Sequence, residues 1–104
     1  MSSPATDKTA SPPGWTFVTN HAAVLLSIAR DPEIRLRDVA ERVGITERAA
    51  QRIVRDLVEE GYVERRRVGR RNVYSVVPNR QMRHRVVRHH QVGALLRVLA
   101  PYAV

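Results

Sequence analysis

The sequence contains no cysteine among its 104 residues. Disulfide frameworks, thiol-based redox sensors and cysteine-ligated metal sites are therefore excluded. Long apolar stretches are also missing, since no run approaches the roughly 20 residues that a membrane-spanning helix needs. The N-terminus lacks the apolar segment that follows a basic start in a signal peptide. These absences predict a cytoplasmic protein with no membrane partner.

No pattern typical of catalysis or metal binding stands out. Ser/His/Asp and Cys/His sets at catalytic spacing are missing, and the carboxylates fall mainly on the outer faces of expected helices. His84, His89 and His90 lie close in sequence, but their spacing is poor for a metal site. His84 and His89 are five residues apart and share a helical face poorly, the side chains of the neighbours His89 and His90 diverge, and no carboxylate is near in the sequence. We expect His90 to pack at an interface and the other two to be solvated or to extend a basic patch. The sequence thus predicts no enzyme, no metal site and no cofactor.

The net charge of the chain is +8, and acidic residues are scarce in its second half. Residues 30–61 contain seven Arg against eight Asp or Glu, whereas residues 64–90 contain nine Arg against Glu64 alone. Lys8 is the single lysine. A GC-rich genome would explain the preference for Arg over Lys, but it would not explain the segregation of charge. The segregated charge favours a polyanionic partner.

The chain divides into three stretches by composition and periodicity. Residues 1–14 are rich in Ser, Pro, Thr and Ala without periodicity, which predicts a disordered tail. Residues 15–80 hold the helix and strand patterns expected of one compact domain. Residues 81–104 hold a last helical pattern.

The domain begins with a buried helix. Either Thr19 or Asn20 is a suitable N-cap for a helix that starts near residue 21. This helix is apolar almost all round, which indicates burial, and an Asp-Pro pair ends it. Trp15, Phe17 and Val18 come just before the cap. We expect these three apolar residues to hold the start of the helix against the core.

Two short amphipathic helical patterns follow, joined by a tight turn. The first has Val39, Ala40 and Val43 at helical spacing. Gly44 supplies the positive φ that the turn needs, and Thr46 is a suitable N-cap for the second helix. The apolar face of the second helix consists of Ala50, Ile53, Val54, Leu57 and Val58. A Glu-Glu-Gly sequence closes it, which completes the spacing of a helix-turn-helix.

The apolar period then changes to that of strands. Residues 62–68 and 73–77 flank Gly-Arg-Arg-Asn as a hairpin loop. Val63, Tyr74 and Val76 are the expected inward residues. Three helices followed by a hairpin indicate an α+β fold.

An amphipathic helix follows the Pro-Asn break after the hairpin. Its apolar residues recur at i, i+3, i+4, i+7 and i+10, and are Val92, Leu95, Leu96, Leu99 and Tyr102. Gly93 weakens this helix locally. Such a stripe either joins the core of the same chain or forms an interface.

The turn, the junction from helix to strand and the hairpin together resemble those of bacterial winged helix-turn-helix transcriptional regulators, particularly the MarR-like and ArsR-like group. The resemblance covers roughly residues 22–77, by the motif spacing of that fold. It is carried by Val-Ala and Gly-Ile-Thr around the turn, by Leu57 and Gly-Tyr-Val at the junction, and by Gly-Arg-Arg-Asn-Val-Tyr in the hairpin. It implies a three-helix core with a β-hairpin wing over residues 15–80, followed by a C-terminal amphipathic helix.

In such regulators the second helix of the motif enters the major groove and the wing contacts the backbone or the minor groove. By this resemblance, the recognition-helix residues are Thr46, Glu47, Arg48, Gln51, Arg52 and Arg55. The wing residues are Arg65, Arg67, Arg70, Arg71 and Asn72. Two Arg at a tip beside a Gly suggest that Arg70 and Arg71 clamp phosphates or insert into the minor groove.

The recognition-helix residues suggest a division of tasks. Gln51 can read adenine through two hydrogen bonds, Arg48 or Arg52 can read guanine, and Arg55 is better placed for a phosphate. Glu47 either accepts from cytosine or supports the N-terminus of the helix through the dipole, and we favour the second role.

Resemblance and charge together predict a sequence-specific regulator of transcription that binds double-stranded DNA as a dimeric repressor in the nucleoid. The homodimer interface is expected at Val92, Leu95, Leu96, Leu99 and Tyr102. The alternative is a winged-helix module for protein interaction or RNA binding, without sequence-specific DNA binding. The sequence identifies no small-molecule effector.

Overall fold

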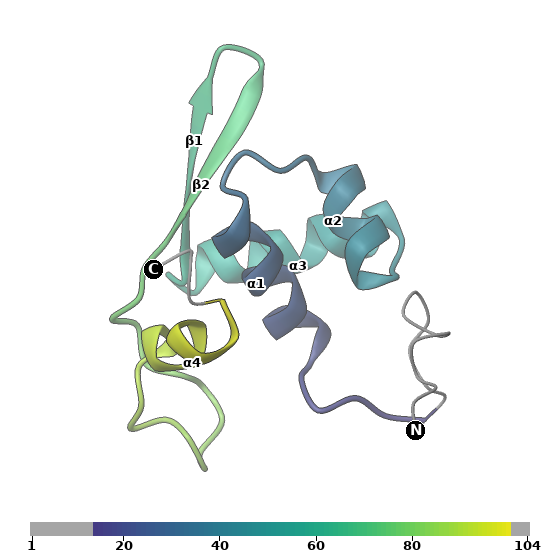
Figure 1. The fold of residues 1–104 in the computed structure, drawn as a ribbon. Coiled ribbons are helices and arrows are strands. Elements are labelled where there is room, and N and C mark those ends of the chain that lie inside the picture. Colours follow the sequence, from purple (N-terminus) through teal and green to yellow (C-terminus); the bar gives the residue numbers. More distant parts are fainter. Residues whose placement is uncertain (1–13, 101–104) are drawn as a thin grey trace.

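Three helices pack against one another ahead of the hairpin. The computed structural model describes residues 14–100, in which α1 spans Asn20–Arg30, α2 spans Leu36–Val43 and α3 spans Glu47–Glu59 (Figure 1). α3 contacts both α1 and α2, so all three helices share one apolar interior. This arrangement confirms the helix-turn-helix that the sequence predicts.

Capping groups set the ends of these helices. Thr19 Oγ1 accepts a hydrogen bond of 3.1 Å, and Thr46 Oγ1 one of 3.0 Å, in each case from the backbone N–H three residues further on. Each threonine thereby satisfies a donor that the first helical turn leaves open. Gly44 follows α2 with φ +85°, a left-handed conformation that suits glycine, and it begins the turn into α3.

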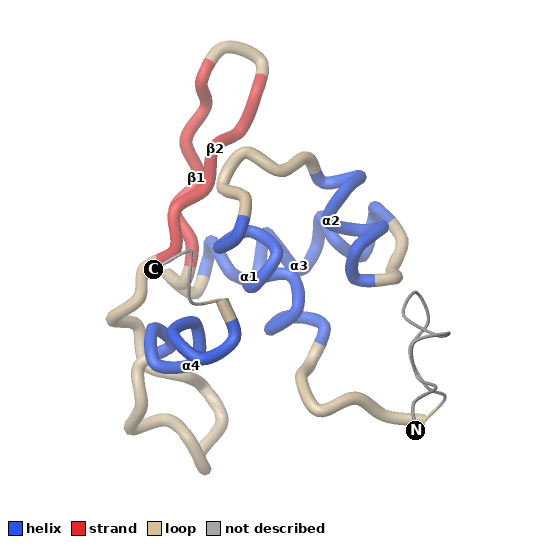
Figure 2. Tube along the Cα trace, in the orientation of Figure 1, coloured by secondary structure: helices blue, strands red, loops and turns tan. Residues whose placement is uncertain are grey.

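The chain after α3 folds back on itself as a hairpin. β1 (Val63–Val68) and β2 (Arg71–Val76) pair antiparallel and project away from the helices (Figure 2). Val63 and Tyr74 are buried as expected, and Val76 is half-buried. The base of the hairpin therefore belongs to the core, while its far end is exposed.

The turn of the hairpin is shorter than the sequence suggested. It consists of two residues, Gly69 and Arg70, instead of four. Gly69 has φ +62° and Arg70 does not have a positive φ, which is the φ pattern of a two-residue hairpin turn with glycine first. Arg71 and Asn72, which the sequence analysis assigned to the loop, are consequently strand residues of β2.

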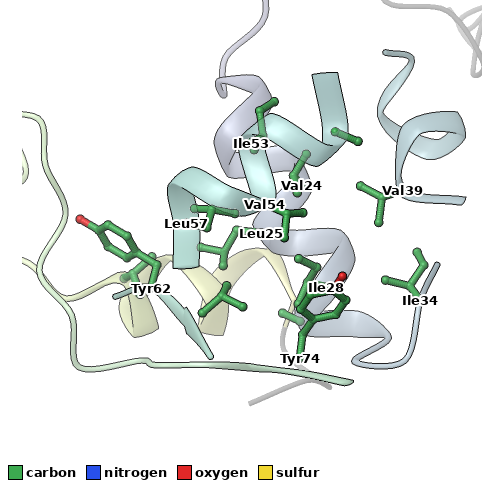
Figure 3. Close-up of a cluster of buried hydrophobic side chains, with 14 of the residues drawn as sticks. Val24, Leu25, Ile28, Ile34, Val39, Ile53, Val54, Leu57, Tyr62 and Tyr74 are labelled. Atoms are coloured by element: carbon green, nitrogen blue, oxygen red, sulfur yellow. The ribbon is translucent and has the colours of Figure 1, made fainter. Parts of the chain in front are cut away.

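Side chains from all the elements form one hydrophobic core (Figure 3). Val24, Ile28 and Val39 are completely inaccessible to solvent. α4 (Val92–Leu99) contributes Val92 and Leu96 to the same core. These two residues were expected at a dimer interface, but they face the interior of their own chain because α4 packs against α1.

The last helix is also shorter than the stretch expected for it. Residues 80–91 form turns, which Gln81 and Gln91 close with an isolated β-bridge. Arg and His fill most of this stretch and leave no apolar face, so the expected helix does not start near residue 81. No helix in the part of the chain that the structure describes is long and apolar enough to cross a membrane. Tyr102 and residues 1–13 of the expected tail lie outside the described residues.

A close backbone contact fixes the start of α4. The N–H of Gly93 donates to the carbonyl oxygen of Pro78 at 2.8 Å, and a Cβ at this position would lie 2.9 Å from the same oxygen. Glycine is therefore needed for the approach, even though it lowers helix propensity. At the other end of α4, Arg30 Nη2 donates to the carbonyl oxygen of Leu99 at 3.0 Å.

The aromatic residues ahead of α1 do not pack as expected. Trp15 is 69% exposed and Phe17 is 93% exposed. Their rings contact each other edge to face, with centroids 5.0 Å apart. The prediction that they hold α1 against the core is wrong, since the Thr19 cap sets the start of the helix without them.

Candidate nucleic-acid interface

The exposed face of α3 carries the polar residues expected of a recognition helix. The six residues assigned to it are all exposed, namely Thr46, Glu47, Arg48, Gln51, Arg52 and Arg55. The opposite face of α3 is buried through Ala50, Ile53, Val54 and Leu57. Because the buried face is packed into the core, the orientation of the exposed face is fixed.

A groove of about 560 Å³ lies along this face, between α3 and β1. It is lined by Thr46, Arg48, Ala49, Gln51, Arg52, Arg55 and Arg65, and we call it the arginine groove. None of these lining residues is acidic, and within residues 14–100 none of the four arginines forms an ion pair. Guanidinium groups present donors in a planar fork that matches phosphate oxygens and the edge of guanine. The arginine groove is thus chemically suited to a nucleic acid.

Arg65 reaches the arginine groove from the hairpin. It pairs across the sheet with Tyr74, and directly paired residues project from the same face of a sheet. Tyr74 faces the core, so Arg65 lies on the helical side of the sheet, next to α3. The sequence analysis assigned Arg65 to the wing; in the structure it lies on β1 of the hairpin and also lines the arginine groove beside α3.

The tip of the hairpin holds its arginines in different ways. Arg70 is exposed in the turn itself. Arg67 Nε donates to the carbonyl oxygen of Gly69 at 3.4 Å, across the same turn. Arg71 Nη2 donates to the carbonyl oxygen of Glu33 at 3.0 Å and so bridges the hairpin to the connection between α1 and α2. Asn72 is half-buried. Arg70 and Arg71 were expected to act together at the tip. Arg71, however, is hydrogen-bonded to Glu33 of its own chain.

A backbone bond supports the same bridge. The N–H of Tyr74 donates to the carbonyl oxygen of Pro32 at 2.9 Å. Together with the Arg71 to Glu33 bond, it ties β2 to the segment just before α2 and sets the angle at which the hairpin leaves the helices. Sequence reasoning missed this role for Arg71, although a Gly-first turn was a signal that Arg71 lies in a strand.

α1 is joined to α3 by a polar contact that the sequence did not reveal. His21 Nε2 and Asp56 Oδ2 lie 2.9 Å apart, and both side chains are about half exposed. The hydrogen bond from His21 is the largest influence on Asp56 and lowers its pKa below the ordinary value of 3.8. Desolvation acts in the opposite direction, and the charges of His21, Arg52 and Arg55 lower the pKa further. Asp56 is therefore ionised at neutral pH. The two partners are 35 residues apart, so no local signal could have paired them.

The other histidines are held by local contacts. His84 Nδ1 accepts a hydrogen bond from the N–H of Val86 at 3.1 Å, and the rings of His89 and His90 are tilted against each other with centroids 4.3 Å apart. His90 is exposed on the single chain. In residues 14–100 there is no cluster of three or more His, Cys, Asp or Glu that could hold a metal ion.

Comparison with known proteins adds to this geometry. The sequence model of the MarR family matches residues 16–71, which is just over half of the chain. The chain belongs to the MarR family. Of the two groups that the sequence resembled, MarR is therefore the one that matches, and the winged helix-turn-helix is confirmed. A search of curated proteins gave no match.

Two solved structures are similar to this MarR-family chain. The PcaV transcriptional regulator from Streptomyces coelicolor, in complex with its natural ligand, is 25% identical with a TM-score of 0.49, and the match covers 67% of this chain and 47% of that one. The zinc-dependent MarR family transcriptional regulator AdcR, in the Zn(II)-bound state, is 19% identical with a TM-score of 0.47, and the match covers 70% of this chain and 55% of that one. The chain thus spans about half the length of these regulators. The MarR family is one of DNA-binding transcriptional regulators and not of enzymes.

Proposed function

We propose that this protein is a transcriptional regulator that binds double-stranded DNA sequence-specifically, as a dimeric repressor. The arginine groove carries the proposal, because it combines four guanidinium groups that form no ion pair within residues 14–100 with Gln51 and Thr46 on one exposed and rigidly held face. α3 would enter the major groove of a duplex, which has the width to admit a helix. MarR-family membership supports the same reading.

The lining of the arginine groove divides into base-reading and phosphate-binding positions. Gln51 and either Arg48 or Arg52 would contact base edges, since each lies on the exposed face of the first two turns of α3. A good bidentate contact of this kind discriminates against the wrong base by about 1–3 kcal/mol. Arg55 and Arg65 lie farther along the groove and would bind phosphates, which fix the register of the protein on the duplex. Glu47 lies in the first turn of α3, where a carboxylate favours the helix dipole.

The hairpin would add a second point of contact. Arg70 lies at the exposed tip of the hairpin. It would meet the backbone or the minor groove beside the bound helix. Arg67 and Asn72 lie one step back from the tip, in paired positions on β1 and β2. Arg71 contributes by holding the hairpin at a fixed angle through Glu33.

Dimerisation would double these contacts. On α4, Leu95 and Leu99 are half-buried within the chain and are the members of the expected interface that retain exposed surface in the described residues. A two-fold dimer of winged helices would bind a pseudo-palindrome whose half-sites lie about one helical turn, roughly 34–36 Å, apart. Occupancy of such a site would block access of the polymerase to the DNA and so repress transcription.

Selection of bound duplexes from a random pool tests this function. We expect enrichment of one motif with two-fold symmetry, retained when the salt concentration is raised and when single-stranded RNA competes. The double variant Arg48→Ala/Arg52→Ala should lose the preference for one base pair of the motif, whereas Arg97→Ala, which removes an exposed arginine of α4 outside the arginine groove, should keep the motif unchanged. Preference for single strands would support RNA binding instead. Failure to bind any nucleic acid would support a protein-interaction scaffold.

A further inference from the structure

The segment that leads into α1 exposes an unusual amount of aromatic surface. Residues 14–19, which we call the arm, include Trp15 and Phe17, and these are two of only five aromatic residues in the chain. Both are largely exposed and contact each other. Adjacent aromatic residues that remain exposed on a small protein indicate a surface that binds something.

The arm is directed away from the body of its own chain. Thr19 holds the start of α1 as an extended N-cap residue with ψ 166°. The hydroxyl of Thr16 donates to the carbonyl oxygen of Val18 at 2.6 Å and gives the arm a local bend. In Figure 1 the arm, in purple ahead of α1, runs to the opposite side of the molecule from α4.

A second groove, of about 640 Å³, lies between α1, the C-terminal half of α3, residues 82–87 and α4. We call it the terminal groove. Its floor consists of the buried side chains of Leu25, Leu57 and Val92. Its apolar walls are formed by the half-buried side chains of Ala22, Met82, Val87 and Leu95. No segment within residues 14–100 fills it.

Charged pairs flank this apolar interior. His21 and Asp56 contact each other at 2.9 Å where α1 meets α3, and Arg83 Nη1 contacts Glu60 Oε1 at 2.7 Å where the 82–87 segment meets α3. An apolar centre with a polar rim is the usual anatomy of a protein–protein interface, and Met and aromatic residues are enriched at such centres. The terminal groove therefore matches an apolar, aromatic occupant.

We propose that the arm of one copy of this protein docks in the terminal groove of a second copy, and that the exchange is reciprocal. Thr19 ends the arm and also lines the terminal groove, so the two surfaces adjoin. A two-fold axis near the start of α1 would place each arm over the groove of the partner, which makes the contact self-complementary and closed. The direction of the arm in its own chain favours this exchange over docking within one molecule.

The area available is sufficient for a stable dimer. A Trp or Phe side chain buries about 150–250 Å² when it is covered. Two arms would then bury roughly 600–1,000 Å², and the grooves that receive them a similar area, for a total of about 1,200–2,000 Å². This range is that of a standard specific interface between proteins.

The exchange would couple the dimer to the recognition helix. Asp56, Leu57, Glu59 and Glu60 of α3 line the terminal groove, at the end of the helix away from Thr46. A docked arm would hold this end and thereby fix the spacing between the two copies of α3. The inference supplies a contact for the dimer of the proposed function, but it concerns association alone and is tested without DNA.

Trp15 is the single tryptophan, so its fluorescence reports directly on the arm. We expect the emission of the full chain to lie at short wavelength at high concentration and to shift to longer wavelength on dilution, at the concentration where sedimentation shows the dimer dissociating. Emission typical of exposed tryptophan in a stable dimer would overturn the proposal. So would buried-type emission in a monomer, because that result places the arm in its own groove.

Paired variants locate the contact. Trp15→Ala with Phe17→Ala should weaken the dimer by about 30-fold or more, as expected for loss of aromatic anchors. Val98→Ser removes an exposed apolar residue of α4 that does not line the terminal groove and should leave the dimer unchanged. If Val98→Ser dissociates the dimer and the arm variant does not, the interface lies on another face.

Mixing experiments test reciprocity. Leu95→Arg blocks the terminal groove but keeps the arm, and its thermal unfolding shows whether the fold is kept. If it does not fold, Met82→Lys replaces it on the same wall. Each variant alone should be monomeric, whereas a mixture of the arm variant with the blocked-groove variant should form a heterodimer held by one intact arm and one intact groove. Absence of that heterodimer, with both variants folded, would contradict arm exchange.

Discussion

The two arginines at the hairpin tip should affect DNA binding in different ways. Arg70 is exposed in the turn, whereas Arg71 donates to the carbonyl oxygen of Glu33. If Arg70 neutralises one phosphate, Arg70→Ala should reduce the slope of log K against log salt by about 0.9. Between 50 and 200 mM salt, the affinity of Arg70→Ala for DNA should therefore fall by a factor that is about 3.5 times smaller than the factor for the wild type.

Arg71→Ala should instead loosen the hairpin. The lost bond is exposed, so we expect it to contribute no more than about 1 kcal/mol, or about fivefold in affinity if the hairpin must be ordered on DNA. The salt slope should change by less than half of the amount seen for Arg70→Ala. Arg71→Lys keeps the charge but loses the planar geometry, and it should behave like Arg71→Ala.

Fluorescence anisotropy with the selected duplex, over a series of salt concentrations, measures both quantities for each variant. Arg97→Ala serves as the control for removal of a positive charge elsewhere. Equal changes of slope for Arg70→Ala and Arg71→Ala would refute the reasoning, because they would show that both side chains meet phosphates. An unchanged slope for Arg70→Ala would refute the contact at the tip.

Two further predictions concern the frame that holds the interface. Gly93→Ala should destabilise the fold by about 1 kcal/mol, because a steric cost of about 1–3 kcal/mol against Pro78 exceeds the gain in helix propensity of about 1 kcal/mol. Thermal unfolding should show a Tm that is about 4–8 °C lower than that of the wild type. A raised Tm would contradict the close approach of Gly93 to Pro78. Asp56 should titrate below 3.8 by NMR and return toward that value in His21→Ala. Since the folded-state pKa is lowered, the stability that this contact gives is present above the ordinary value and is lost as pH falls through the lowered pKa; identical acid unfolding of wild type and His21→Ala would argue against it.

Local signals in the sequence predicted the helices well. Thr19 and Thr46 cap helices through side-chain contacts that span three residues, and Gly44 has the left-handed conformation that its position implied. Such features depend on neighbouring residues alone and can be recognised without knowledge of the fold. The exposed face of α3 followed from the same periodicity that predicted its buried face.

Features that depend on tertiary contacts were missed. The shift of Arg71 from loop to strand follows from the two-residue turn, and its bond to Glu33 spans 38 residues. Arg65 joins the arginine groove because of the sheet register, which alternation alone does not fix. The stretch before α4 carried no periodic pattern, and its turns are closed by a bridge between Gln81 and Gln91. The burial of Trp15 and Phe17 was expected because both side chains are apolar. In the structure both are exposed.

The central claim is that the arginine groove reads duplex DNA. Its most direct test is the ratio of affinities for the selected duplex and a scrambled duplex at physiological salt, measured for the wild type and for the double variant Arg48→Ala/Arg52→Ala. We predict a ratio of about 10³ or more for the wild type, and a loss of discrimination of about 1–3 kcal/mol in the double variant, because one of the two arginines reads a base pair. Equal affinity of the wild type for both duplexes, or an unchanged ratio in the double variant, would contradict the account.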